Sequence, residues 1–323
     1  MIEIESLTKQ YGPTTVVDDV SMSIASGSIT VIVGTSGSGK STLLRMINKL
    51  IEPTHGRVRI DGRDTALTPA PLLRRKIGYV IQGHGLFPHR TVAENIATVP
   101  KLLGWEGARI RARVDELLKV FQLDPREYAG KFPYQLSGGQ QQRVGVARAL
   151  AAEPAVLLMD EPFGALDPII RGKAQDDLLE IQRRFGTTVV LVTHDMDEAF
   201  RLGERVAVMN QGRVLQYDRP TALLTRPIDP FVSRLTGTAD RSLRLLSLIK
   251  AGEAAEPGTA AEPGAMGAPG GALGPTVSAD ASLREVLCDL LWRGAAAVSV
   301  LNSDGTAAGT LTVARILARG KPG

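Results

Sequence analysis

The chain has 323 residues, of which 43% are hydrophobic and 22% charged, and its formal net charge is +4 at pH 7. These values are ordinary for a soluble globular protein, and the length predicts about two domains. The mild charge, without a long block of like charges, gives no indication of a nucleic-acid partner, and the single cysteine, Cys288, excludes a disulfide framework and a cysteine metal site.

The first residues, Met-Ile-Glu-Ile-Glu, are acidic and alternating, whereas an export signal is basic and then apolar. Residues 20–39 carry no charge, but Ser and Gly interrupt them, so they do not predict a membrane-spanning helix. We therefore expect the chain to stay in the cytoplasm.

The N-terminal third predicts strands and one helix. Residues 2–4, 16–24 and 56–60 alternate apolar and polar residues, as antiparallel strands do. Residues 29–33 form an apolar run typical of a buried strand, and residues 41–50 read as a helix.

The middle of the chain predicts a helical insertion followed by a return to strands. Residues 109–120 carry apolar residues at helical intervals, and Leu136-Ser137 predicts another helix start, so we expect a helical subdomain over about 88–152. Residues 155–159 and 189–193 are short apolar runs typical of buried parallel strands, and helices and strands alternate from there to about residue 235.

Residues 34–41 read Gly-Thr-Ser-Gly-Ser-Gly-Lys-Ser, which has the spacing of a phosphate-binding loop between a strand and a helix. Gly34, Gly37 and Gly39 allow backbone N–H groups to approach phosphate oxygens closely, and Lys40 adds a mobile positive charge. The helix N-terminus faces the phosphates, and the hydroxyl of Ser41 is expected to reach Mg²⁺. The alternative is a Gly/Ser-rich turn without a ligand.

Two further sets of residues complete a hydrolytic site. The strand at 156–159 leads into Asp160, which can hold Mg²⁺, and Glu161, which can polarise the attacking water. His194 follows the strand at 189–193, where it could contact the γ-phosphate. Alone, the two acids could be a solvated strand end and the histidine a structural residue. The order of loop, Leu-Ser-Gly-Gly-Gln string at 136–140, acids and histidine favours an ATP-driven machine.

Together these strings resemble the ATP-binding subunit of ATP-binding cassette (ABC) transporters over roughly the first 235 residues. The resemblance implies an α/β fold with a RecA-like core, an antiparallel β subdomain and a helical subdomain, in a nucleotide-binding domain over 1–236. It also implies a homodimer of ATPase subunits that closes head to tail, with residues 165–167 crossing the interface.

The resemblance assigns roles to individual positions. Tyr11 would stack on adenine, although an aromatic there could simply pack on the core. Gln82 would sense Mg²⁺ and the attacking water, Glu161 would be the catalytic base and His194 its γ-phosphate partner. The implied ATP-binding residues are Tyr11, Gly34, Thr35, Ser36, Gly37, Ser38, Gly39, Lys40, Ser41, Thr42, Ser137, Gly138, Gly139, Gln140 and Asp167, with Ser137 and Gly139 acting in trans, and the implied Mg²⁺ ligands are Ser41, Gln82 and Asp160.

Residues 79–89 and 91–105 are similar to the subunits that power uptake of osmoprotectants such as glycine betaine, carnitine and choline. This implies integral-membrane permease subunits as partners, an extracytoplasmic solute-binding protein as an indirect partner, and a peripheral location on the cytoplasmic face of the cell (inner) membrane. ATP would close the dimer and hydrolysis would reopen it.

Two other functions remain open at this point. The shared cassette strings permit import of another small solute, such as a sulfonate or an amino acid. A soluble cassette ATPase acting on DNA or the ribosome is opposed by the single cassette and by the lack of a long coiled coil or a CxxC hook.

The C-terminal part predicts a separate small module. Residues 237–275 read as a connecting helix and a flexible linker, the Ala, Gly, Pro and Glu-rich part of which begins at 251. Residues 282–292 predict a helix, 297–301 a strand, 302–305 a turn and 309–317 a strand leading into a helix. Residues 276–318 thereby resemble one cystathionine-β-synthase (CBS) motif; the alternative is a tail without a regulatory role.

Overall fold

The computed structural model describes residues 1–323 except 84, 165, 238–239, 258–274 and 322–323. The chain divides into two compact units, Met1–Arg219 and Pro220–Gly323. This division lies before residue 236, where the sequence places the end of the first domain.

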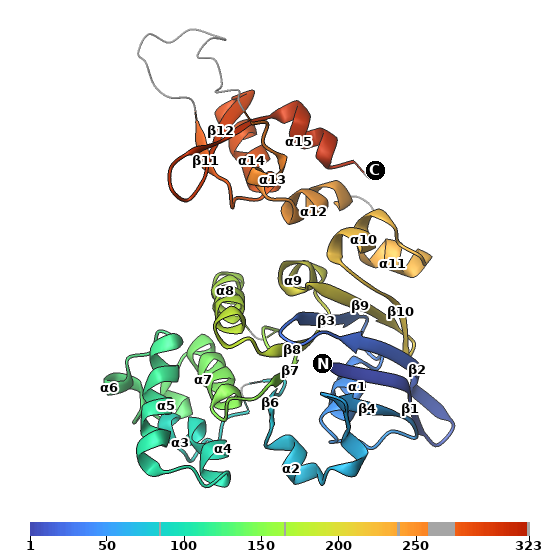
Figure 1. The fold of residues 1–323 in the computed structure, drawn as a ribbon, viewed down its shortest axis with the longest axis vertical. Helices are drawn as coiled ribbons and strands as arrows, with labels where there is room; N and C mark the ends of the chain where they lie inside the picture. The colour runs from blue at the N-terminus through green and yellow to red at the C-terminus, as the bar shows by residue number, and fades with distance from the viewer. Residues whose placement is uncertain (84, 165, 238–239, 258–274, 322–323) are drawn as a thin grey trace. The chain divides into compact units, whose positions relative to one another are not determined.

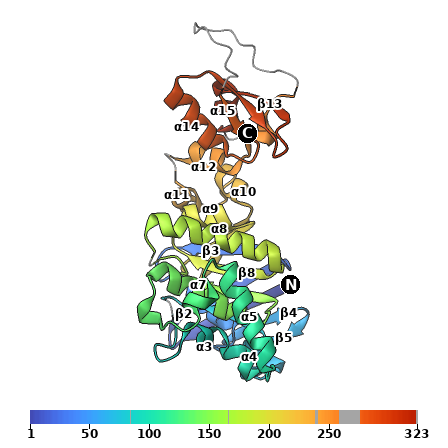
Figure 2. The ribbon, with the colours of Figure 1, turned by 90° about the vertical axis from the view of Figure 1, so that its left-hand side faces the viewer.

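The first unit contains two sheets (Figures 1 and 2). The antiparallel sheet has the order β2-β1-β4-β5 and comprises β1 (Ile2–Tyr11), β2 (Thr14–Ile24), β4 (His55–Ile60) and β5 (Arg63–Asp64). The second sheet has the order β10-β9-β3-β8-β7-β6 and comprises β3 (Ile29–Gly34), β6 (Ile77–Val80), β7 (Val156–Asp160), β8 (Thr188–Thr193), β9 (Arg205–Asn210) and β10 (Arg213–Asp218). The strands expected from alternating and apolar runs are confirmed.

The second sheet is parallel from β9 to β6, and β10 is its antiparallel edge strand. β3 and β8 are buried at every residue, as expected for strands covered on both faces. Because the carboxyl ends of parallel strands lie at one edge of a sheet, the segments after β3, β6, β7 and β8 come together there.

Helix α1 (Lys40–Ile47) connects the two sheets through their common core. Its residues Leu43, Leu44, Met46 and Ile47 are buried and share one apolar cluster with residues of both sheets. This packing holds the N-terminus of α1 at the loop after β3 (Figure 1).

The expected helical insertion is present. It comprises α3 (Val92–Ile96), α4 (Thr98–Leu102), α5 (Gly107–Val120), α6 (Pro125–Tyr128), the 3-10 helix η2 (Pro133–Gln135) and α7 (Gly138–Leu150). The other helices of this unit are η1 (Thr65–Leu67), α2 (Ala70–Arg74), α8 (Pro168–Phe185) and α9 (Met196–Leu202). Among the described helices of the chain, none is both long and apolar enough to cross a bilayer.

The second unit begins with α10 (Pro220–Thr225), α11 (Pro230–Leu235), α12 (Arg241–Leu248) and α13 (Ala251–Ala254). These are followed by β11 (Thr276–Ser278), α14 (Leu283–Arg293), β12 (Ala297–Leu301), β13 (Ala307–Thr312) and α15 (Val313–Arg319). β12 pairs in parallel with β11 and antiparallel with β13. The elements expected after residue 282 are confirmed.

The expectation of a linker from residue 251 is wrong for its first residues. Ala251 and Ala254 are fully buried in the apolar core of this unit, and Glu256 and Thr310 exchange backbone hydrogen bonds of 3.1 and 3.2 Å. Alanine contributes little apolar area, but its small side chain permits close packing, which a composition argument does not detect. Residues 258–274 of the expected linker lie outside the described residues.

Candidate nucleotide-binding and hydrolysis site

The loop at 34–41 joins β3 to α1 and is built around glycines. A Cβ on Gly34 would lie 2.0 Å from the carbonyl oxygen of Met209, and one on Gly39 would lie 2.4 Å from that of Val16. Gly37 and Gly39 also adopt positive φ angles of 78° and 98°. No side chain caps the N-terminus of α1, so its first N–H groups suit an anion.

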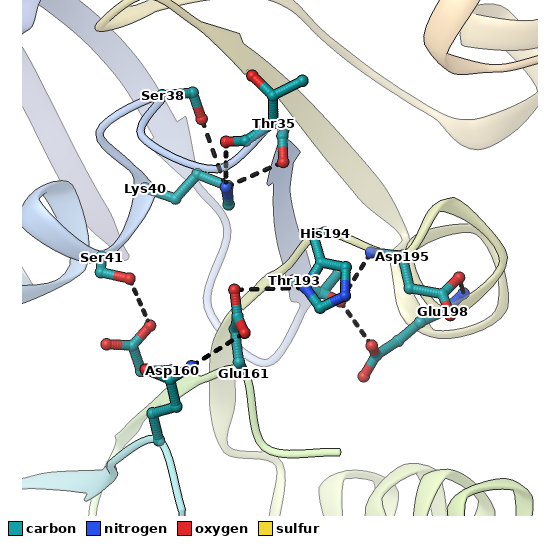
Figure 3. A network of polar contacts seen from close by, with 12 residues as sticks. Thr35, Ser38, Lys40, Ser41, Asp160, Glu161, Thr193, His194, Asp195 and Glu198 are labelled. Carbon is teal, nitrogen blue, oxygen red and sulfur yellow. Dashed lines mark hydrogen bonds and ion pairs between the residues drawn. The ribbon is translucent and has the colours of Figure 1, made fainter. Parts of the chain in front are cut away.

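Lys40 extends over this loop and is buried (Figure 3). Its Nζ donates to the carbonyl oxygens of Gly34 (2.9 Å) and Thr35 (2.8 Å) and to the hydroxyl of Ser38 (3.4 Å). Burial lowers the pKa of Lys40 from its usual value, while the carboxylates of Glu161 and Asp160 oppose that shift. The side chain thus places a positive charge at the opening of the loop.

Ser41 and Asp160 meet beside the loop. The Ser41 hydroxyl donates to Oδ1 of Asp160 at 2.7 Å, and Oδ2 of Asp160 lies 3.5 Å from Nη2 of Arg45. The side chain of Asp160 is 2% exposed. Mg²⁺ prefers hard oxygen ligands and often uses one or two carboxylates together with substrate phosphates, so this hydroxyl and carboxylate fit that ion.

Glu161 connects three strand ends. Its Oε1 lies 3.4 Å from Nδ1 of His194 (Figure 3). Its Oε2 accepts a hydrogen bond from Nε2 of Gln82 at 3.2 Å. Its backbone N–H donates to the carbonyl of Val192 at 3.0 Å, and its φ of 45° lies in the left-handed region, which is unusual for a residue other than glycine. The six predicted side chains of Lys40, Ser41, Gln82, Asp160, Glu161 and His194 therefore gather at one edge of the sheet.

The predicted residues outside the segment 34–42 and this cluster occupy helix starts or a strand end. Ser137 caps α7 and forms a capping box with Gln140, and Asp167 caps α8 by accepting from the N–H groups of Ile169 and Ile170. Gly138 and Gly139 begin α7, and a Cβ on Gly139 would lie 2.6 Å from Cγ2 of Ile170. In the described part of the chain, no hydrogen bond or ion pair joins Ser137 or Gly139 to the cluster around Glu161. Ala165 lies outside the described residues.

Tyr11 ends β1 and is 49% exposed, with Nζ of Lys9 lying 4.9 Å from the centre of its ring. The core-packing alternative for Tyr11 is therefore not observed. Thr35, Ser36 and Thr42 lie in the loop and first turn as the motif requires.

Sequence reasoning missed a second layer of polar residues around His194. The hydroxyl of Thr193 donates to Oε2 of Glu198 at 2.6 Å and accepts from the N–H of Asp195 at 3.1 Å (Figure 3). Burial raises the pKa of Glu198 to about 7. The sequence feature that could have revealed Glu198 is an acidic residue on the apolar face of α9, between Met196 and Ala199.

Comparison with known proteins gives the following matches. Residues 17–164 match the family described as ABC transporter. The glycine betaine uptake system ATP-binding protein of Escherichia coli (strain K12) is 45% identical over 311 residues, which cover 96% of this chain and 97% of that protein. The osmoprotectant import ATP-binding protein of Salmonella typhimurium (strain LT2) is 49% identical over 261 residues, which cover 79% and 68% respectively.

Among solved structures, a dimeric ATP-binding cassette in a post-hydrolysis state, bound to ADP and Pi, is 38% identical with a TM-score of 0.61. The match covers 68% of this chain and 99% of that one.

Proposed function

Since the chain belongs to the ATP-binding subunits of ABC transporters, we propose that it hydrolyses ATP to power import of osmoprotectants such as glycine betaine, choline and carnitine. The ATPase activity follows from the family, and the solute class is supported by the names of the relatives from E. coli and Salmonella. The contacts that join Gln82, Glu161 and His194 at the edge of the sheet are the observation that carries the hydrolytic assignment.

In this proposal the loop at 34–42 and Lys40 bind the phosphates of ATP, and the exposed ring of Tyr11 stacks on adenine. Ser41, Asp160 and the Gln82 amide would hold Mg²⁺, which neutralises phosphate charge when it is bound. Glu161 orients and polarises the attacking water, and His194 contacts the γ-phosphate.

We also propose that two copies of the chain form the working ATPase. Ser137 caps α7, and Gly138, Gly139 and Gln140 form its first turn, where an anion can be bound, yet among the described residues they make no hydrogen bond or ion pair with the chain's own phosphate loop. They would instead contact ATP held by the second copy, near Asp167. The match to a dimeric cassette supports this arrangement.

The remaining partners follow from the same proposal. Permease subunits in the cytoplasmic membrane would carry the solute, and an extracytoplasmic binding protein would deliver it, so the chain would act at the cytoplasmic face without binding solute or nucleic acid. The domain limits proposed are 1–236 for the cassette, with a helical subdomain over about 88–152, then a connecting segment over 237–275, of which Ala251 and Ala254 are buried in the core of the second unit.

The segment 276–318 is proposed to be a single CBS-like motif. Its order of strand, helix, strand, strand and helix, from β11 to α15, supports this assignment. To test whether this segment responds to ionic strength, the increase of solute uptake with salt can be compared between the full chain and a chain that lacks residues 276–318.

The substitution Glu161→Gln tests the hydrolytic assignment. It keeps the shape and the contact to Gln82 but removes the base, so we expect ATP to bind normally while the rate of phosphate release falls at least about a hundredfold. Glu180→Gln, at an exposed position on α8, is the matched control and should retain full activity. Normal turnover by the Glu161 variant would refute the assigned base.

Transport assays test the solute class. Cells that carry the wild-type chain should accumulate labelled glycine betaine, choline or carnitine after a salt upshift, and cells with Glu161→Gln should not. If uptake of all three is the same in both strains, the substrate belongs to another class, such as sulfonates or amino acids.

Failure to co-purify with membrane subunits would favour a cassette ATPase that is not part of a transporter.

A further inference from the structure

Two neighbouring segments carry the groups that this proposal assigns to hydrolysis. Glu161 follows β7 and His194 follows β8, and their side chains approach within 3.4 Å. Glu161 also adopts a left-handed backbone conformation, which costs energy and persists only where the surrounding structure holds it. Contacts outside β7 and β8 are therefore needed to hold these two segments in position relative to each other.

Arg171, in the first turns of α8, contacts both segments. Its Nη2 donates to the carbonyl oxygen of Leu166 at 3.0 Å, in the segment that begins with Glu161. Its Nη1 lies 3.5 Å from Oδ2 of Asp195, the residue after His194. The Nε of Arg171 is buried and has no hydrogen-bond partner among the described residues, so the two terminal nitrogens make the contacts.

Asp195 divides its two oxygens between two tasks. Oδ1 caps α9 by accepting from the N–H groups of Asp197 (2.8 Å) and Glu198 (3.2 Å). Oδ2 lies nearest to Arg171. An asparagine at this position could keep the cap through its amide oxygen while removing the negative charge that faces Arg171.

We infer that Arg171 is a positioning residue for ATP hydrolysis, which fixes the separation of Glu161 and His194 by tying the segment after β7 to Asp195. The inference rests on the proposed roles of Glu161 and His194. The planar, forked guanidinium group suits this task because it can serve two acceptors in fixed directions. In the described part of the chain, Arg171 makes no hydrogen bond or ion pair with the phosphate loop, so it should affect turnover and not ATP affinity.

The test compares Arg171→Gln, Asp195→Asn and the double variant in the full-length chain. Each single variant should lower kcat for ATP about tenfold, since small displacements of reacting groups are costly, and the dissociation constant for ATP should stay within about twofold of wild type. The double variant should be no slower than the slower single variant, because both substitutions remove the same link. Thermal unfolding of each variant checks that the fold is retained.

A second ion pair between the same two helices supplies the control. Arg201 on α9 contacts Asp176 on α8 at 2.7 Å, but these side chains are 46% and 64% exposed and lie outside the two segments. Arg201→Gln should keep kcat near the wild-type value. If Arg201→Gln lowers kcat as much as Arg171→Gln does, the experiment measures general packing of α8 against α9, and the inference fails. Wild-type kcat in the Arg171 and Asp195 variants would also overturn it. So would a double variant whose fall in kcat is the product of the two single falls.

Glu161→Gln and His194→Ala are measured in parallel. If they abolish turnover and Arg171→Gln keeps the wild-type kcat, the positioning role fails and the proposed function stands. If turnover survives in Glu161→Gln and His194→Ala, the proposed hydrolytic roles themselves fail.

Discussion

The carboxyl group of Glu198 is largely buried beside the segment that carries His194. Oε2 accepts from the Thr193 hydroxyl at 2.6 Å, whereas Oε1 is buried without a hydrogen-bond partner among the described residues. Burial raises the pKa of Glu198 from 4.5 to about 7; the Thr193 hydrogen bond and the charges of Arg171 and His194 oppose that shift, and Asp195 adds to it. The group is thus neutral or partly ionised near pH 7.

This pKa predicts a pH dependence of stability. Between pH 4.5 and about 7 the folded chain holds a proton on Glu198 that the unfolded chain releases. The contribution of this proton to the free energy of unfolding is therefore complete below pH 4.5 and is lost as the pH rises through about 7. The contribution is on the order of 3 kcal/mol. Urea unfolding of wild type and Glu198→Gln at pH 5 and pH 8 should show a smaller fall in unfolding free energy for the variant; equal falls would contradict the prediction.

At the scale of elements, a buried ion pair joins α7 to α8. Nη2 of Arg143 lies 2.9 Å from Oδ2 of Asp177, with exposed side-chain fractions of 16% and 9%. Burial raises the pKa of Asp177, and the charges of Arg143 and Lys173 oppose that shift. Because Ser137 caps α7 and Asp167 caps α8, this ion pair links the two helices that begin at predicted ATP-contacting residues.

Breaking this pair on one side should be costly. Arg143→Met leaves a buried carboxylate without its partner, so we expect the free energy of unfolding to fall by about 3 kcal/mol. Arg143→Met combined with Asp177→Leu should recover most of that loss, because neither charge remains buried. Chemical denaturation of the single and double variants measures this; costs that simply add would show that the two side chains are not coupled.

At the scale of the whole molecule, the second unit is assembled from both sides of residues 258–274. Leu246, Ala251 and Ala254 share an apolar core with Leu283, Val286, Leu287, Leu290, Val298, Val300, Leu311 and Ile316. Arg315 also donates from Nε to the carbonyl oxygen of Ala254 at 2.6 Å. The module beginning at β11 is therefore incomplete without α12 and α13.

Two fragments test this view of the second unit. A fragment of residues 220–323 should unfold cooperatively on heating, whereas a fragment of residues 275–323 should lack a cooperative transition, because it loses Leu246, Ala251 and Ala254 from the apolar core and the acceptor of the Arg315 hydrogen bond. Circular dichroism during thermal unfolding distinguishes them. A cooperative transition in the shorter fragment would restore the original expectation of a self-contained module after the linker.

The sequence by itself determined the strands at 2–4, 16–24, 29–33, 56–60, 156–159 and 189–193 and the glycine-rich loop between a strand and a helix. These properties are local: glycine spacing, an apolar strand and a following helix are readable within a few neighbouring residues. The positions of Asp160, Glu161 and His194 after apolar runs were also readable, because parallel strands bring their carboxyl ends to one edge. The individual roles of these residues stay a prediction.

Only the tertiary structure decided which side chains support that site. The contacts of Arg171 with Leu166 and Asp195, and that of Glu198 with Thr193, depend on how α8 and α9 face the segments after β7 and β8. Apolar periodicity shows which face of a helix is buried but not which polar atom it meets there. The burial of Ala251 and Ala254 was hidden for a similar reason, since close packing of small residues depends on a partner surface that lies far away in the chain.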